Sequence, residues 1–186
     1  MFDWLLKDIR QHASAANMSR KFHNGLALVF VDAAERIRDR TELNRVCLSG
    51  GCFLNALLLE TMIAEMKERL GMAVMLITHA MGVVAETAQR VAVMYAGKVV
   101  EEAPVAELFG NPRHPYTRGL IRSIPRIDRA GRKERLAAIA GVVPSLLEPA
   151  EGCRFAARCE FAMPVCVAAT PPLRKVATEH EVACVL

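Results

Sequence analysis

The stretch RVCLSGGCFLNALLLETMIAEMKERLGMAVMLIT, residues 45–78, decides the fold of the first part of the chain. It predicts a short strand over 45–48, a tight Ser-Gly-Gly turn, and a helix that begins at about Phe53. The run MAVMLIT predicts a second strand, and the lack of alternation in this run favours burial on both faces of a parallel sheet. A strand, a helix and a strand in this order are typical of an α/β fold.

Two features of this stretch indicate a site for phosphate. A glycine turn between a strand and a helix is typical of places where backbone N–H groups and the helix dipole face an anion, although Gly50 and Gly51 could equally do no more than make the turn. His79 follows the second strand, where a histidine is either part of such a site or a structural residue at the strand end. No G-x-x-x-x-G-K-[ST] loop is present in the sequence.

The flanking segments also carry patterns of secondary structure. Residues 20–39 predict a helix, because an apolar stripe recurs at helical spacing. The stripe consists of Phe22, Leu26, Val29, Phe30 and Ala33. Residues 90–103 predict two strands joined at Ala96-Gly97, and residues 104–110 predict a short helix with proline at its start and glycine at its end.

The composition excludes some classes of protein. No run of about 18 uncharged apolar residues is present, so we expect no membrane span. The N-terminus mixes acidic and basic residues and does not have the form of a secretory signal. Basic residues gather between Arg113 and Arg135 without the aromatic interleaving of a nucleic-acid surface, so no nucleic-acid partner is expected.

The chain has six cysteines, and four of them crowd the C-terminal part. Cys153, Cys159, Cys166 and Cys184 have the spacing C-x5-C-x6-C-x17-C, which differs from the C-x2-C pairs of zinc ribbons. The spacing alone leaves open a metal site or unrelated thiols. Cys47 and Cys52 flank the glycine turn, and we interpret them as bystanders.

From about residue 68 onward the chain resembles the C-terminal part of the ATP-binding subunits of bacterial oligopeptide and dipeptide ABC transporters. The motifs that carry this resemblance are LITHAMGVVAETAQRVAVMYAGKVVEEAPVAELFGNPRHPYTRGLIRSIP, GVVPSLLEPAEGCRFAARCEFAMPVC and HEVACVL. The resemblance implies that His79 is the switch histidine, which contacts the γ-phosphate of ATP. The family has aspartate and leucine after this histidine, whereas this chain has Ala80 and Met81.

The same resemblance implies cofactors and partners. It implies a [4Fe–4S] cluster on Cys153, Cys159, Cys166 and Cys184; zinc is the second choice and an empty site the third. Arg154 and Arg158 lie within a few residues of two of these cysteines, so we expect them to be positive neighbours of the cluster. The resemblance also implies membrane permease subunits and a second ATPase subunit as partners, and a cytoplasmic location at the inner face of the plasma membrane. We expect His114 and Tyr116, in the segment NPRHPYTRG, to be capping and packing residues.

Residues 15–66 resemble a different family, the carbamoyltransferases of hydrogenase maturation. SRKFHNGLA and VCLSGGCFLNALLLE carry this resemblance. It implies that Ser49, Gly50, Gly51 and Asn55 approach the phosphates of a nucleotide. The metal-ligand histidines and the later aspartate-glycine loop of that family are absent from this sequence.

Together these resemblances predict an α/β fold with a partial nucleotide-binding-type sheet and helices, followed by an irregular, proline-rich, cysteine-containing extension. The expected parts are 1–67 (carbamoyltransferase-like), 68–110 (ABC ATPase core) and 111–186 (transporter extension). The leading hypothesis is a truncated or chimeric ATP-binding subunit of a peptide transporter. The alternatives are a carbamoyltransferase-like nucleotide-binding module and a small metal-binding interaction domain.

We expect no independent ATPase activity from this chain. The sequence lacks the phosphate loop, the acidic strand end and the signature loop that this reaction requires. ATP and magnesium would bind only where another chain supplied the missing half of the site.

Overall fold

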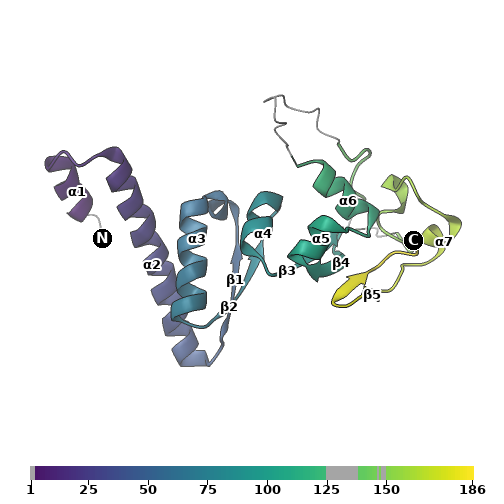
Figure 1. Ribbon diagram of the computed structural model, residues 1–186, viewed down its shortest axis with the longest axis horizontal. Helices are drawn as coiled ribbons and strands as arrows, with labels where there is room; N and C mark the ends of the chain where they lie inside the picture. The colour runs from purple at the N-terminus through teal and green to yellow at the C-terminus, as the bar shows by residue number, and fades with distance from the viewer. Residues whose placement is uncertain (1–2, 125–137, 146, 148–149) are drawn as a thin grey trace. The chain divides into compact units, whose positions relative to one another are not determined.

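The computed structural model describes residues 3–124, 138–145, 147 and 150–186 (Figure 1). The chain divides into two compact units, Met1–Ala80 and Met81–Leu186, and each has its own sheet. Helices and strands are mixed, which confirms the predicted α/β class. The predicted boundaries after residues 67 and 110 stay predictions. Part of the predicted basic run between Arg113 and Arg135, residues 125–135, lies outside the described residues.

The first unit begins with two helices, α1 (Asp3–Arg10) and α2 (Ala15–Thr41). Helix α2 begins after Ser14, whose side chain accepts a hydrogen bond from the N–H of Asn17, and it ends at Glu42, which has a left-handed φ of 59°. The ammonium of Lys21 lies 2.8 Å from a carboxylate oxygen of the buried Asp8 and joins the two helices.

The predicted helix over 20–39 is confirmed, but its apolar stripe is largely exposed. The buried side chains of α2 are Ala27 and Val31, whereas Phe22, Val29 and Phe30 are exposed. The helix therefore packs on a different face from the one that the stripe indicated. None of the helices in the described residues is long and apolar enough to cross a lipid bilayer.

A strand–helix–strand segment forms the rest of the first unit. Strands β1 (Arg45–Ser49) and β2 (Ala73–Ile77) pair in parallel, with Ser49 opposite Ile77, and α3 (Ala56–Ala64) connects them. The helix continues into a π-helical turn, η2 (Glu65–Arg69). Figure 1 shows α3 alongside the two strands. Its buried side chains form the core of this unit: Leu58, Leu59, Met62 and, in η2, Met66.

Two details of this segment differ from the prediction. A 3-10 turn, η1 (Gly51–Leu54), precedes α3, because Asn55 caps the helix and sets its start three residues after Phe53. The prediction that β2 is buried on both faces is wrong, since Met75 is 61% and Ile77 is 56% exposed. Successive side chains alternate between the faces of a strand, and in the described residues only one face of this two-stranded sheet is covered.

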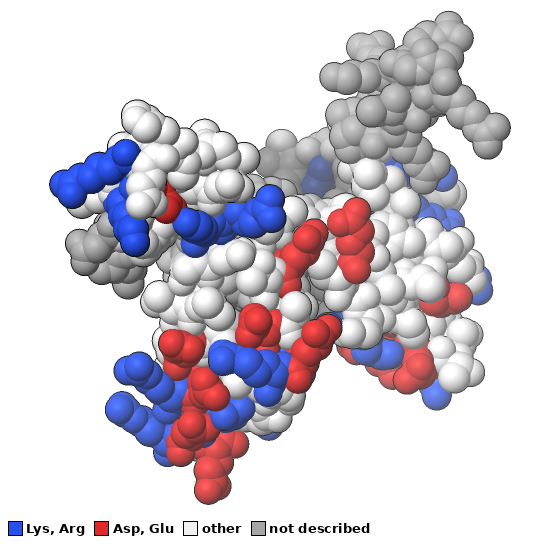
Figure 2. All heavy atoms as spheres, turned by 60° about the vertical axis from the view of Figure 1, so that its left-hand side comes forward, with Lys and Arg blue, Asp and Glu red and all other residues white. Residues whose placement is uncertain are grey.

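Charged side chains of the first unit pair with one another. Nε of Arg69 lies 2.9 Å from Oε2 of Glu65, and Nη2 of Arg38 lies 2.9 Å from Oδ1 of Asp39. Such exposed pairs contribute little to stability, about 0–1 kcal/mol each. Figure 2 shows acidic and basic side chains interspersed, so the face that it draws carries no extended patch of a single sign.

The second unit starts with α4 (Met81–Thr87) and the hairpin of β3 (Arg90–Tyr95) and β4 (Lys98–Pro104). The hairpin confirms the prediction, and its two turn residues, Ala96 and Gly97, have φ values of 45° and 80°. Positive φ at both positions is typical of the turns whose twist matches that of paired strands. Helices α5 (Val105–Gly110) and α6 (Pro115–Arg122) follow.

The segment predicted to be irregular contains further regular elements. After a 3-10 turn, η3 (Ala156–Arg158), and α7 (Pro164–Ala168), strands β5 (Arg174–Ala177) and β6 (His180–Val182) form a second hairpin. Strand β6 pairs antiparallel with β4, which gives the sheet order β3-β4-β6-β5. The sequence analysis missed this hairpin because its turn has no glycine, proline or asparagine; Glu179 adopts the left-handed conformation instead, with a φ of 58°.

An aromatic cluster lies in the core of the second unit. The ring centroids of Tyr95 and Tyr116 are 4.7 Å apart, and that of Phe155 lies 5.2 Å and 5.4 Å from them, respectively. Val93, Val100 and Leu108 belong to the same core. The cluster confirms that Tyr116 is a packing residue.

Glu101 connects three parts of the second unit from inside the core. Its side chain is fully buried. Its Oε1 accepts hydrogen bonds from the backbone N–H of Arg113, at 2.6 Å, and from Nε2 of His180, at 2.8 Å. Its Oε2 accepts a hydrogen bond from the backbone N–H of His114 at 2.9 Å. One carboxylate of β4 thereby holds the start of α6 and strand β6.

We predict that Glu101→Ala lowers the free energy of unfolding by about 3 kcal/mol, because three donors, those of His114 and His180 buried, lose their acceptor. Glu102→Ala on the same strand is the matched control; it removes the pair with Arg90, whose atoms are 2.6 Å apart and partly exposed, and should cost less than about 1 kcal/mol. Urea unfolding of each variant, monitored by hydrogen exchange of the β4 and β6 amides, measures the two changes in the free energy of unfolding. Equal costs for the two variants would contradict the prediction.

Candidate functional site

The glycine turn lies at the carboxyl end of β1. Ser49 is the last residue of the strand, and Gly50 follows with a φ of 116°, a conformation that side chains with a Cβ rarely adopt. A Cβ at Gly50 or Gly51 would meet open space. Backbone conformation, and not crowding, therefore makes glycine necessary at position 50.

Asn55 does not lie free beside this turn. Its Oδ1 accepts the N–H of Leu58 at 3.1 Å as the cap of α3, and its Nδ2 lies 2.8 Å from Nε2 of His23. Nδ1 of His23 lies 2.7 Å from the carbonyl oxygen of Ser19, so this ring donates through Nδ1 and accepts at Nε2. The sequence analysis gave His23 no role, although it belongs to the motif SRKFHNGLA.

His79 lies exposed in the loop between β2 and α4, where Thr78 accepts the N–H of Ala80 on its hydroxyl at 3.1 Å. Because Ser49 pairs with Ile77, the glycine turn and His79 leave neighbouring parallel strands at the same edge of the sheet. Ligands of α/β sheets bind at the carboxyl ends of strands. The fold thus brings together two stretches that the sequence assigned to different families.

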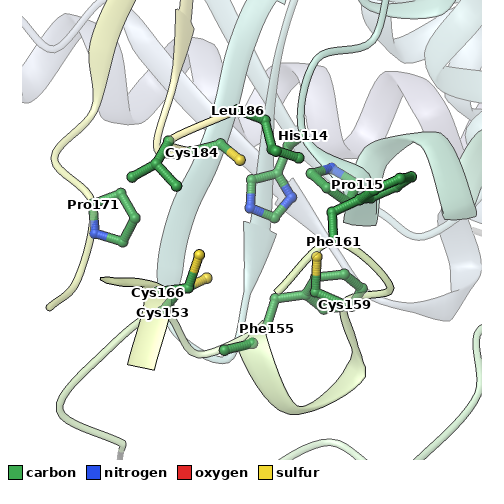
Figure 3. A pocket seen from close by; sticks show the side chains of 12 residues that line it. His114, Pro115, Cys153, Phe155, Cys159, Phe161, Cys166, Pro171, Cys184 and Leu186 are labelled. Carbon is green, nitrogen blue, oxygen red and sulfur yellow. The ribbon is translucent and has the colours of Figure 1, made fainter. Parts of the chain in front are cut away.

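The four C-terminal cysteines line one hollow in the second unit, which we name the cysteine hollow (Figure 3). Its cavity volume is about 20 Å³, and the hollow opens to solvent. Its lining consists of Cys153, Cys159, Cys166, Cys184, His114 and apolar residues that include Phe155 and Leu186. The fold therefore gathers all four members of the C-x5-C-x6-C-x17-C pattern.

Each cysteine is held by a different local element. The backbone N–H of Cys153 donates to the carbonyl oxygen of Cys166, in α7, at 2.7 Å. Cys159 directly follows η3. Cys184 follows β6, and the N–H of Ala183 donates to the carbonyl oxygen of Val100 at 2.9 Å, which ties this end of the chain to β4.

Gly152 permits the close approach of the first and third cysteine segments. A Cβ on this residue would lie well inside contact distance of the backbone carbonyl oxygens of Cys166 and Val167. The hydroxyl of Thr170 also donates to the carbonyl oxygen of Gly152, at 2.9 Å. Sequence reasoning missed this glycine because the residues it must approach are distant in the chain.

The thiols of the hollow are free and partly desolvated. Burial raises the pKa of the Cys153 thiol, and the neighbouring Cys166 and Cys184 raise it further. Burial also raises the pKa of Cys159, and the other three thiols act in the same direction. Thiols in such surroundings stay protonated until a metal displaces the proton.

The donor set of the hollow consists of four thiols, the ligands that iron–sulfur clusters and many structural zinc sites use. Over the described ranges, no three His, Cys, Asp or Glu side chains are grouped so as to hold one metal ion. A zinc ion requires its sulfur ligands at about 2.3 Å from one point. The four thiols instead surround a hollow, which is the arrangement that a cluster with a separate iron for each thiolate requires.

Arg154 and Arg158 donate hydrogen bonds to backbone carbonyl oxygens near the cysteines. The guanidinium of Arg154 donates to the carbonyl oxygen of Ala96, in the hairpin turn. Arg158 donates to the carbonyl oxygens of Ala140 and Ile139, at 2.7 Å and 2.8 Å. Neither residue lines the cysteine hollow, and their role as positive neighbours of a cluster stays a prediction.

His114 is a capping residue, as predicted. Its Nδ1 accepts the N–H of Tyr116 at 3.1 Å as the cap of α6, and its side chain is 1% exposed. Burial lowers the pKa of His114 to about 4, against the opposing charge of Glu101. The sequence analysis did not foresee that the ring also lines the cysteine hollow.

We predict that Gly152→Ala lowers the free energy of unfolding by roughly 1–3 kcal/mol, because a Cβ there forces two backbone segments apart. The hydrogen bond from Cys153 to Cys166 should weaken, which hydrogen exchange of the Cys153 amide measures. The matched control is Gly82→Ala in α4, where a Cβ meets nothing within 4 Å; it should be neutral or stabilising by up to about 1 kcal/mol. An unchanged Cys153 amide in Gly152→Ala would contradict the proposed clash.

Comparison with known proteins gives two matches to families. Residues 100–166 match the family described as the C-terminal region of oligopeptide/dipeptide transporters. Residues 1–81 match, weakly, the family described as the second subdomain of the carbamoyltransferase Kae1-like domain. The resemblance of the N-terminal part rests on this weak match and stays a prediction.

Several curated relatives cover the C-terminal two thirds of the chain. A probable peptide ABC transporter ATP-binding protein of Sinorhizobium fredii is 55% identical over 66% of this chain and 36% of its own length. An oligopeptide transport ATP-binding protein of Mycobacterium tuberculosis is 50% identical over 62% of this chain and 19% of its length. A dipeptide transport ATP-binding protein of Lactococcus lactis is 46% identical over 64% of this chain and 34% of its own length.

This chain therefore spans about a third or less of the length of these relatives. Residues 100–166 are similar to the C-terminal region of oligopeptide/dipeptide transporters, in agreement with the predicted resemblance.

Proposed function

We propose that this chain is a cluster-binding form of a peptide ABC transporter ATP-binding subunit and does not hydrolyse ATP by itself. The observation that carries the proposal is the convergence of Cys153, Cys159, Cys166 and Cys184 on one hollow. These residues would hold a [4Fe–4S] cluster through their thiolates. Zinc is the second choice.

The surroundings of the thiols support this proposal. All four are free, and apolar side chains such as Phe155 and Phe161 line the same hollow. An apolar shell excludes water and controls the potential of a bound cluster. When bound, such a cluster supplies one-electron redox chemistry and cross-links three segments that are distant in the sequence.

The transporter part of the proposal is supported by the relatives, whose names describe them as ATP-binding proteins of peptide transport. By this likeness the partners are membrane permease subunits and a second ATP-binding subunit, at the cytoplasmic face of the membrane. Hydrolysis requires a phosphate loop with its lysine, an acidic strand end and a signature loop. This sequence contains none of them, so they would have to come from outside these 186 residues.

A second candidate function is nucleotide binding by the first unit. The pairing of Ser49 with Ile77 favours it, because the glycine turn and His79 share one sheet edge. The N–H groups of Gly50 and Gly51 would face the phosphates, and His79 would approach them from the next strand. Asn55 caps α3 and is therefore a positioning residue in this candidate site.

Anaerobic reconstitution of the chain with iron and sulfide tests the cluster. We expect a brown protein with broad visible absorbance and about four iron and four sulfide per chain. Each of the single variants Cys153→Ser, Cys159→Ser, Cys166→Ser and Cys184→Ser should lower the cluster content, because each removes one ligand. The control is the double variant Cys47→Ser/Cys52→Ser, in the first unit, which should load fully. A colourless, metal-free protein would contradict the proposal, and one bound zinc per chain would favour the second choice.

ATP and magnesium distinguish the two candidate functions. We expect no hydrolysis above background, since no lysine of a phosphate loop is present to hold the β- and γ-phosphates. Binding detected by calorimetry, abolished by Ser49→Ala and unaffected by His79→Ala, would support the carbamoyltransferase-like module. Hydrolysis that His79→Ala abolishes would overturn the proposal that the chain is inactive by itself.

A further inference from the structure

We infer that His114 donates a hydrogen bond from Nε2 to a sulfur atom of the cluster in the cysteine hollow, and thereby raises its reduction potential. This inference rests on the cluster proposed above. It assigns a tuning role to a residue that caps a helix and is not a ligand.

Hydrogen bonding fixes the protonation of the ring. Nδ1 of His114 accepts the backbone N–H of Tyr116 at 3.1 Å and so carries no proton. A neutral imidazole has one N–H, which must then be on Nε2. The cap of α6 therefore makes the ring a donor on its other side.

Several contacts hold the ring in place. The backbone N–H of His114 donates to Oε2 of the buried Glu101 at 2.9 Å. The imidazole lies 5.8 Å from the ring of Phe155, centroid to centroid, and is 1% exposed. Figure 3 shows the ring facing the space between the thiol groups of Cys184, Cys153, Cys166 and Cys159. These contacts fix the direction in which the ring donates.

The hollow offers this N–H few other acceptors. Among the described residues that line it, His114 has the only side-chain nitrogen, and the others are cysteine, proline, alanine, valine, leucine and phenylalanine. The sulfide and thiolate sulfurs of a cluster are negatively charged acceptors, so binding satisfies the donor.

The arginines do not compete for this role. Arg154 and Arg158 donate to backbone carbonyl oxygens of Ala96, Ala140 and Ile139, outside the lining of the hollow. Hydrogen bonds to cluster sulfurs stabilise the more negative, reduced state and raise the potential. His114 thus raises the potential, while the apolar lining of the hollow also contributes to its value.

The test is His114→Asn in the full chain. Asparagine is a preferred helix cap and can accept the N–H of Tyr116, but its short side chain lacks the ring and the Nε2 donor. The matched control is His12→Asn, in the first unit, at an exposed position with a φ of 55° that asparagine tolerates. Both variants are reconstituted with iron and sulfide, and their midpoint potentials are measured by redox titration with EPR detection.

We expect His114→Asn to bind the same amount of iron and sulfide as the wild type, with a more negative potential. A loss of about tenfold in the equilibrium constant for reduction corresponds to about 59 mV for one electron. His12→Asn should match the wild type. A second measurement uses wild-type protein with ¹⁵N-labelled histidine, in which the reduced cluster should show the weak nitrogen coupling of a hydrogen bond.

The outcomes separate this inference from the proposal beneath it. Failure of the wild type to bind a cluster overturns the proposed function. A loaded His114→Asn with unchanged potential overturns the role of His114 alone. Loss of the cluster in His114→Asn, or strong nitrogen coupling typical of direct ligation in the wild type, also overturns it, since His114 would then be a ligand or a folding requirement.

Discussion

The buried carboxylate of Glu101 is the interaction on which the second unit depends. A carboxylate inside a protein loses its hydration, and the loss is tolerable only when donors replace the water. Here two backbone N–H groups and one imidazole do so. One of these N–H groups belongs to His114, and the imidazole of His180 belongs to the strand that leads to Cys184. The position of one thiol and of the ring beside it thus follows from a single side chain on β4.

Local signals predicted much of the fold. Ala96-Gly97 marked the turn between β3 and β4, and Pro104 and Gly110 marked the two ends of α5. These features depend on neighbours in the sequence, so the sequence contains them. The β5–β6 hairpin was missed because its turn uses Glu179, and the exposure of Met75 was missed because an apolar run does not show whether a second layer covers it.

The candidate site could be predicted only in part. The spacing of the cysteines indicated four possible ligands, and the fold places all four around one hollow. Gly152, His114 and the partners of Arg158 depend on contacts between distant segments, which no local pattern encodes. Arg158 illustrates the difference: adjacent to Cys159 in sequence, it donates its hydrogen bonds to residues 139 and 140.

The aromatic cluster of the second unit gives the molecule a separate optical signal. Its two tyrosines, Tyr95 and Tyr116, are the only ones in the chain, and the single tryptophan, Trp4, lies in α1 of the first unit. Tryptophan fluorescence therefore reports on one unit and tyrosine fluorescence on the other. Because Phe155 contacts both tyrosines and also lines the cysteine hollow, a chromophore bound in that hollow lies close enough to quench the tyrosine emission.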